Sequence, residues 1–230
     1  MRRHFLTGFL LVAIAQMTLA QFRNIRLDEQ GPGNPYVCEP SIAINPRNPD
    51  NIVAASVLNN IYVTTDGGNG WTKVKVESPF GVYGDPALVA DEKGNFYFFH
   101  LSDPSHGRGG YNSEKLDRLV VQESSDGGLT WSAGESIGLN HPKDQDKQWP
   151  AIDPKGNLYL TWTQFDTYGD PDPNCHSNIL FSRSRNGQKW TEPVQISQTP
   201  GDCIDSDNTA EGAVPAPARR ARRRVPPRPR

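Results

Sequence analysis

The tryptophans of this sequence recur at an almost constant interval. Trp71, Trp131 and Trp190 stand 60 and 59 residues apart, and each ends a short polar segment. A fixed period of this length indicates stacked copies of one supersecondary unit, because each copy buries its apolar face against a neighbour. The chain is therefore expected to fold as a row of similar units.

The segments that end at these tryptophans share a pattern of turn-forming residues. They read TTDGGNGW at 64–71, SSDGGLTW at 124–131 and SRNGQKW at 184–190. The glycines are expected to supply positive φ and the aspartates to accept hydrogen bonds from turn amides, so these residues are assigned to structure and not to catalysis. They are Thr64, Asp66, Gly68 and Trp71; Ser124, Asp126, Gly128, Thr130 and Trp131; and Asn186, Gly187 and Trp190.

Each unit also contains apolar runs of strand length. Upstream segments with the sequences EPSIAINP, DPALVAD and WPAIDP each lead through a polar turn into a strand, expected at 52–56, 96–101 and 158–163. A third strand is expected before each Asp-containing turn, at 61–64, 119–124 and 179–184, and a fourth leaves from the tryptophan. Four antiparallel strands per unit make a propeller blade. The sequence thus predicts an all-β fold, a β-propeller of four-stranded antiparallel blades.

The repeats also define the expected domain organisation. A partial propeller is expected over 21–214, with blades at about 38–78, 84–137 and 148–197 and the start of a fourth at 211–216. After Ala216 the pattern stops, whereas a closed propeller has about four to eight blades. The chain is therefore expected to be the N-terminal part of a longer propeller.

The first 20 residues have the features of a secretory signal peptide. Arg2 and Arg3 precede an apolar run at 5–15, and small residues lead up to Ala20, where cleavage is expected. The alternative is a membrane anchor, but a span needs about 20 apolar residues. The protein is therefore expected to be secreted or periplasmic, with no membrane attachment after cleavage.

The C-terminal segment 217–230 is rich in arginine and proline and cannot form a core. It is either a basic tail for anionic surfaces or, as we favour, the out-of-frame end of the coding sequence. Nine of the 24 Lys and Arg lie at the two ends of the chain, which leaves 15 against 26 Asp and Glu, a net charge of −11. That balance excludes a nucleic-acid-binding body and suits metal ions, cationic groups or neutral glycans.

The Asp-containing turns resemble the Asp-box, or BNR, repeat of sialidases and related propellers, with two intact boxes and one worn box between residues 40 and 196. The chain looks like an N-terminal fragment of a protein of the sialidase (exo-α-sialidase-like glycosyl hydrolase) superfamily. This resemblance implies a six-bladed parent that recognises or hydrolyses glycans, the fragment itself being inactive. Two alternatives remain open: a non-catalytic propeller that binds carbohydrate or protein, and a structural surface protein.

A ligand site is expected on the face that carries the long loops, because connections in an up-and-down blade alternate between two faces. The resemblance implies an arginine cluster, a tyrosine nucleophile and an aspartate acid/base, and the sequence does not show that full set. The candidates for catalysis are Asp85, Asp103 and Tyr168, while a pair of carboxylates, as in ordinary glycosidases, stays open. The candidates for ligand binding are Arg108, Arg118, Trp149 and Asp166.

The three cysteines leave one without an intramolecular partner. Cys175 and Cys203 both lie on long-loop connections of the third unit and are the expected disulfide, while Cys38 stays free or pairs with a part of the protein beyond this sequence. No cofactor is expected. The acidic stretches 166–172 and 202–208 offer calcium ligands, but aspartates that simply form turns are the favoured interpretation.

Overall fold

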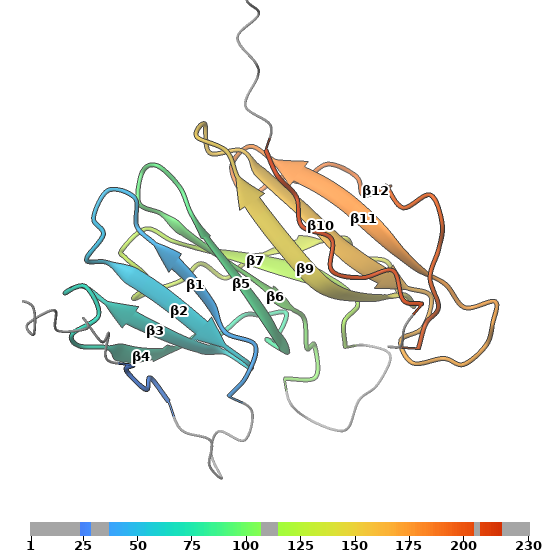
Figure 1. The fold of residues 1–230 in the computed structure, drawn as a ribbon, viewed down its shortest axis with the longest axis horizontal. Helices are drawn as coiled ribbons and strands as arrows, with labels where there is room; N and C mark the ends of the chain where they lie inside the picture. Colours follow the sequence, from blue (N-terminus) through green and yellow to red (C-terminus); the bar gives the residue numbers. More distant parts are fainter. Residues whose placement is uncertain (1–23, 29–36, 107–114, 205–207, 218–230) are drawn as a thin grey trace, which may run out of the picture.

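The computed structural model describes residues 24–28, 37–106, 115–204 and 208–217 (Figure 1). Within these residues every regular element is a strand, and the strands form three four-stranded antiparallel sheets whose neighbours follow chain order. No helix in this part of the chain is long and apolar enough to cross a membrane.

The three sheets follow one another along the chain. The first contains β1 (Ser41–Ile44), β2 (Ile52–Ser56), β3 (Asn60–Thr64) and β4 (Thr72–Lys75). The second contains β5 (Gly84–Ala90), β6 (Phe96–Leu101), β7 (Leu119–Ser124) and β8 (Glu135–Ile137). The third contains β9 (Asp144–Ile152), β10 (Leu158–Phe165), β11 (Ser177–Ser184) and β12 (Val194–Gln195).

The sheets stand side by side with their first strands next to one another. Strand β1 contacts β5, and β5 contacts β9, so these three inner strands are neighbours across the sheets (Figure 1). Four-stranded meanders that face one another around inner strands are the blades of a β-propeller. The fold class predicted from the repeats is therefore confirmed.

Apolar side chains fill the spaces between blades. Phe96 and Phe98 of blade 2 pack with Val53 and Ile61 of blade 1, and a second cluster joins the opposite side of blade 2 to blade 3. Trp131 and Trp190 pack against these clusters, with ring centroids 5.8 Å from Phe98 and 5.9 Å from the ring of Phe99 respectively. The tryptophan of a blade thus lies at the interface with the blade before it.

The Asp-containing turns share one hydrogen-bond pattern. In the second turn Asp126 Oδ1 accepts hydrogen bonds from Ser124 Oγ at 2.8 Å and Thr130 N at 3.0 Å, and Trp131 Nε1 donates to Gly128 O at 3.0 Å. Asp66 accepts in the same way from Thr64 Oγ1 and the Gly70 amide in the first turn. In the third turn the side-chain oxygen of Asn186 takes the place of the carboxylate. These bonds remain within each turn, which is consistent with a structural role.

The inner strand of blade 3 begins earlier than the sequence pattern suggests. Strand β9 begins at Asp144, not at 148, and its pairing with β10 is interrupted by a bulge between Thr161 and Thr163. The matching bulge in β5 contains Asp85 and Pro86, since Gly84 pairs with Leu101 and Ala87 with Phe99. The sequence pattern matched Trp149-Pro150 of blade 3 with Asp85-Pro86 of blade 2. In the structure Lys147 and Gln148 occupy the bulge of β9 and are the equivalents of Asp85 and Pro86, so that match was wrong by two residues.

Two other expectations need correction. Trp71 directly precedes β4, but Trp131 and Trp190 each lie four residues before β8 and β12, so the outer strands do not begin at those tryptophans. Residues 208–217 form no strand, although they lie along β10, where Thr161 Oγ1 donates to Ala213 O at 2.6 Å. The expected start of a fourth blade at 211–216 is present as an irregular segment.

Cys175 and Cys203 form a disulfide with a Cα–Cα distance of 5.6 Å. The bridge packs against Phe165 at the end of β10 and against Tyr168 in the loop that follows. Cys38 is an exposed free thiol. The disulfide therefore fixes the long loops of blade 3 near the start of its inner strand.

Candidate functional site

Charged side chains meet where the three inner strands begin. Glu39, Asp85 and Lys147 each lie five residues before the last residue of their inner strand, and their φ values are 49°, 51° and 50°. All three residues share a left-handed conformation, and at Asp85 and Lys147 it coincides with the bulges of β5 and β9, which re-aim a side chain away from the normal alternation of a strand. Equivalent positions on three blades thus present two carboxyls and one ammonium group together. With Asp146 and Glu211 they are called the mouth cluster below.

Lys147 connects the three blades electrostatically. Its Nζ lies 2.9 Å from Asp85 Oδ2 and 3.4 Å from Glu39 Oε1, and its backbone amide donates to Asp146 Oδ1 at 2.8 Å. The next side chain, Gln148, donates from Nε2 to the backbone carbonyl of Asp85. One lysine of blade 3 therefore contacts carboxylates of blades 1 and 2.

The mouth cluster contains more carboxyl groups than its lysine can neutralise. Burial, followed by the charge of Asp85 and a smaller contribution from Glu211, raises the pKa of Asp146 to about 8 despite the nearby ammonium group. A hydrogen bond with Asp85, together with burial, raises the pKa of Glu39. Burial lowers the pKa of Lys147, but its carboxylate partners raise it more. Near neutral pH the cluster therefore holds both proton donors and proton acceptors.

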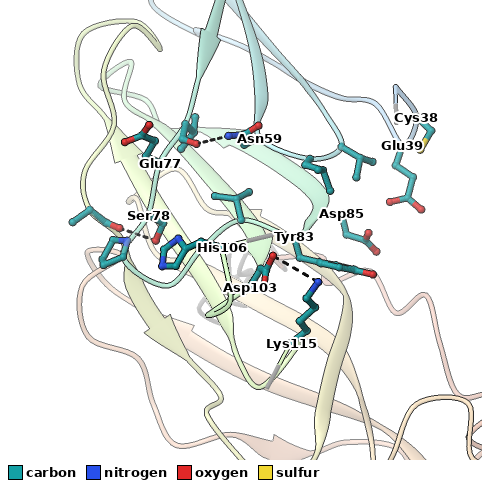
Figure 2. Close-up of a pocket in the computed structure, with 17 residues that line it drawn as sticks. Cys38, Glu39, Asn59, Glu77, Ser78, Tyr83, Asp85, Asp103, His106 and Lys115 are labelled. Carbon is teal, nitrogen blue, oxygen red and sulfur yellow. Dashed lines mark hydrogen bonds and ion pairs between the residues drawn. The ribbon is translucent and has the colours of Figure 1, made fainter. Parts of the chain in front are cut away.

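Two cavities open beside the mouth cluster. The larger, about 1180 Å³, lies between blades 1 and 2, with Glu39 and Asp85 on one side and Asp103, His106 and Lys115 across from them (Figure 2). The smaller, about 440 Å³, is lined by residues of blades 2 and 3, which are Tyr83, Asp85, Leu101, Leu116, Asp146, Lys147, Tyr168 and Gly169. Asp85 and Tyr83 line both cavities, so the two cavities meet at these residues.

The structure separates the three predicted catalytic residues between the cavities. Asp85 lines both, Asp103 lines only the larger and Tyr168 only the smaller. Asp103 is buried and lies 3.9 Å from Lys115 Nζ, while the ring of Tyr168 meets Phe165 edge-on at 5.1 Å. Asp85 therefore shares one cavity with Asp103 and the other with Tyr168.

The predicted ligand-binding residues lie outside both cavities, as far as they are described. Arg118 donates to both oxygens of Asp117, at 2.9 and 2.6 Å, and this contact raises its pKa. Asp166 pairs with Lys143 at 2.7 Å. Trp149 is 51% exposed on the inner strand of blade 3, two residues after Lys147. Arg108 lies outside the described residues.

The acidic stretch 166–172 uses its carboxylates on the chain itself. Asp170 accepts a hydrogen bond from the Asp172 amide, and Asp172 accepts one from the Asn174 amide, both at 2.9 Å. In the part of the chain that the structure describes, no group of three or more His, Cys, Asp or Glu is placed to hold a metal ion. Part of the second stretch, 205–207, lies outside the described residues.

Sequence reasoning found Asp85 but did not select Glu39, Asp146 or Lys147. Glu39 and Asp85 both precede a proline, and this shared pattern could have identified them as equivalent residues of blades 1 and 2. Lys147 has no such proline, and only the bulge in β9 shows that it is their equivalent.

Comparison with known proteins supports the fold. No family model matches the chain, and no curated protein matches it. Among solved structures, an α-L-arabinanase of Penicillium chrysogenum complexed with arabinobiose matches with a TM-score of 0.51 and 16% identity, over 72% of this chain and 50% of that chain. The chain therefore shares the propeller fold of that structure.

Two further matches have lower scores. The GH93 α-L-arabinofuranosidase of Fusarium graminearum with arabinobiose has a TM-score of 0.49 and 16% identity, over 71% of this chain and 49% of that one. The Hadza microbial sialidase Hz136 has a TM-score of 0.40 and 15% identity, over 67% and 35%. The chain spans about half the length of the first two structures.

Proposed function

We propose that this chain is part of an exported, sialidase-like propeller that recognises glycans at its mouth cluster and, in a complete propeller, hydrolyses them. The observation that carries the proposal is the meeting of Glu39, Asp85 and Lys147 from three blades beside two cavities. Sugar sites combine a concave surface with a few convergent polar groups. The fold, shared with glycoside hydrolases, agrees with this but does not define the ligand.

The carboxyls of the mouth cluster differ in the way that glycoside hydrolysis requires. Asp146 keeps its proton near neutral pH because its pKa is raised, whereas Asp85 forms an ion pair with Lys147. A protonated carboxyl can protonate the leaving oxygen of a glycoside, and an ionised partner can stabilise the sugar cation or activate water. In this proposal Asp146 is the acid and Asp85 its ionised partner.

Calorimetric titration of the purified chain with neutral disaccharides, including arabinobiose, cellobiose and lactose, tests the recognition. Wild-type protein is expected to bind at least one of them, and Asp85→Asn to weaken that binding about tenfold or more. Glu92→Gln is the control, because Glu92 is an exposed acid in a turn on the opposite face. Binding that is absent, or equally strong in Asp85→Asn, would refute the proposal.

The alternative is a propeller that binds sugar without cleaving it, and one observation favours it. Trp149 presents an exposed indole close to Lys147, and aromatic faces pack against the apolar faces of sugars. Release of reducing sugar from the bound disaccharide by a complete propeller would support hydrolysis. Binding without release would favour the alternative.

Export is part of the proposal and rests on the sequence of residues 1–20, which lie outside the described residues. Intact mass spectrometry of protein recovered outside the cytoplasm tests it. A mature chain that begins at Gln21 is expected, and retention of Met1–Ala20 in that fraction would contradict cleavage.

A further inference from the structure

The charges around the two cavities indicate which sugars the mouth cluster can take. We propose that it selects uncharged, hydroxyl-rich sugars and rejects sugars that carry a carboxylate, such as sialic and uronic acids. This inference rests on the proposed function and adds the class of ligand to it. It also departs from the substrate that a resemblance to sialidases implies.

The first argument is the balance of charge. Glu39, Asp85 and Asp146 surround Lys147, and Glu211 adds another carboxyl near Asp146. Burial and the charge of Asp85 already raise the pKa of Asp146 to about 8, and in this partly buried site the same lower effective dielectric opposes a further carboxylate beside these groups. An acidic sugar would enter a site that already has an excess of carboxyl groups.

The second argument is that the described residues lining the cavities offer no lysine or arginine that is not already paired with a carboxylate. Their lysines are Lys115 and Lys147, which pair with Asp103 at 3.9 Å and Asp85 at 2.9 Å. No arginine lines either cavity in the described part of the chain, and Arg118 is held by Asp117. Carboxylate ligands are typically held by bidentate arginine, and the described residues that line the cavities do not include one.

The third argument is that the site offers what an uncharged sugar uses. A sugar hydroxyl both donates and accepts hydrogen bonds. Asp146, whose raised pKa of about 8 keeps its proton near neutral pH, can donate, and Asp85, which pairs with Lys147, can accept. The rings of Tyr83 and Tyr168 add aromatic surface for the apolar faces of the sugar.

Matched pairs of sugars test the inference on the full chain. Cellobiose is compared with cellobiouronic acid, and lactose with 3′-sialyllactose, by calorimetric titration at pH 7. In each pair that binds, the neutral sugar is expected to bind at least about tenfold more tightly. The ratio of the affinity for the neutral sugar to the affinity for the acidic sugar is expected to decrease in 0.5 M salt, because salt screens repulsion between charges.

Two variants connect the ratio to the mouth cluster. Asp85→Asn removes one repelling charge and is expected to bring the ratio at least about threefold closer to one. Glu92→Gln is again the control, since Glu92 is an exposed acid in a turn on the opposite face and lines neither cavity, and it is expected to leave the ratio unchanged. Urea denaturation of each variant verifies that it is folded.

The possible results separate the inference from the proposed function. Equal or tighter binding of the acidic sugars would overturn the inference and leave glycan recognition intact. A neutral preference that is the same in Asp85→Asn would overturn the assignment to the mouth cluster. If no sugar of either kind bound, the proposed function and the inference would both fail.

Discussion

Replacing Lys147 with methionine removes a cation that contacts a carboxylate of blade 1 and a carboxylate of blade 2. Methionine keeps an unbranched apolar side chain of similar length, so the change is mainly one of charge. Loss of one partner of a buried ion pair costs about 3–5 kcal/mol, and loss of an exposed pair about 0.2–1 kcal/mol. The side chains of Lys147 and Asp85 are 39% and 17% exposed, which places this pair between the two cases. We expect Lys147→Met to lower the free energy of unfolding by about 2 kcal/mol at neutral pH.

The cost is expected to depend on pH. Glu39 and Asp146 have raised pKa values in the folded protein, so the folded state binds more protons than the unfolded state. Stability from such groups is present below the unfolded pKa and is lost as the pH rises through the folded pKa. Loss of the ammonium group raises both pKa values further. The destabilisation by Lys147→Met is therefore expected to be larger at pH 8 than at pH 5.

Urea denaturation followed by tryptophan fluorescence at pH 5 and pH 8 measures both effects. Lys143→Met is the matched control, because Lys143 forms a single, more exposed ion pair with Asp166 at 2.7 Å. The control is expected to lose at most about 1 kcal/mol, with little difference between the two pH values. The reasoning is refuted if Lys147→Met costs no more than the control, or if its cost does not grow from pH 5 to pH 8.

Three further predictions concern the blades. Gly128→Ala places a Cβ 2.5 Å from a methyl carbon of blade 1 at φ +98°, so urea denaturation should show that the free energy of unfolding falls by about 2 kcal/mol or more. Gly156→Ala is the control: its φ is +81° but no atom lies within 4 Å of the added Cβ, so the free energy of unfolding should fall by only about 1 kcal/mol. Cys175→Ser opens a disulfide that spans 28 residues, and thermal unfolding should report a loss of about 3 kcal/mol. Burial lowers the pKa of His100 to about 4, so the free energy of unfolding decreases as the pH drops from about 6.5 towards 4. In acid denaturation, His100→Gln should make this decrease smaller by about 3 kcal/mol. Equal costs for the two glycine variants, unchanged unfolding of Cys175→Ser, or an unchanged acid profile of His100→Gln would contradict these predictions.

The blades could be predicted because their signals are local in the sequence. The strands β2, β6 and β7 have the bounds that apolar runs between turns predict. The Asp-containing turns depend on contacts within a few residues, so their residue types identify them wherever they occur.

The candidate site could be predicted only in part, because it depends on contacts between blades. A bulge in β9 places Lys147 level with Asp85, and no residue type in the sequence marks that bulge. Arg118 illustrates the opposite case. As an arginine near long loops it was a reasonable ligand-binding residue, yet its Nε and Nη2 already donate to the neighbouring Asp117. Spacing alone does not show which charges are already paired.

The most direct test of the central claim is the mapping of amide chemical shifts. The ¹⁵N-labelled chain is titrated with the neutral disaccharide that binds most tightly. The account predicts the largest shifts at Tyr83 and Asp85 of blade 2 and at Lys147 of blade 3, which together line the smaller cavity. The turn amides of Gly68 and Gly128 on the opposite face should not move. Shifts concentrated at those turns, or saturating sugar with no shift at the mouth cluster, would contradict the account.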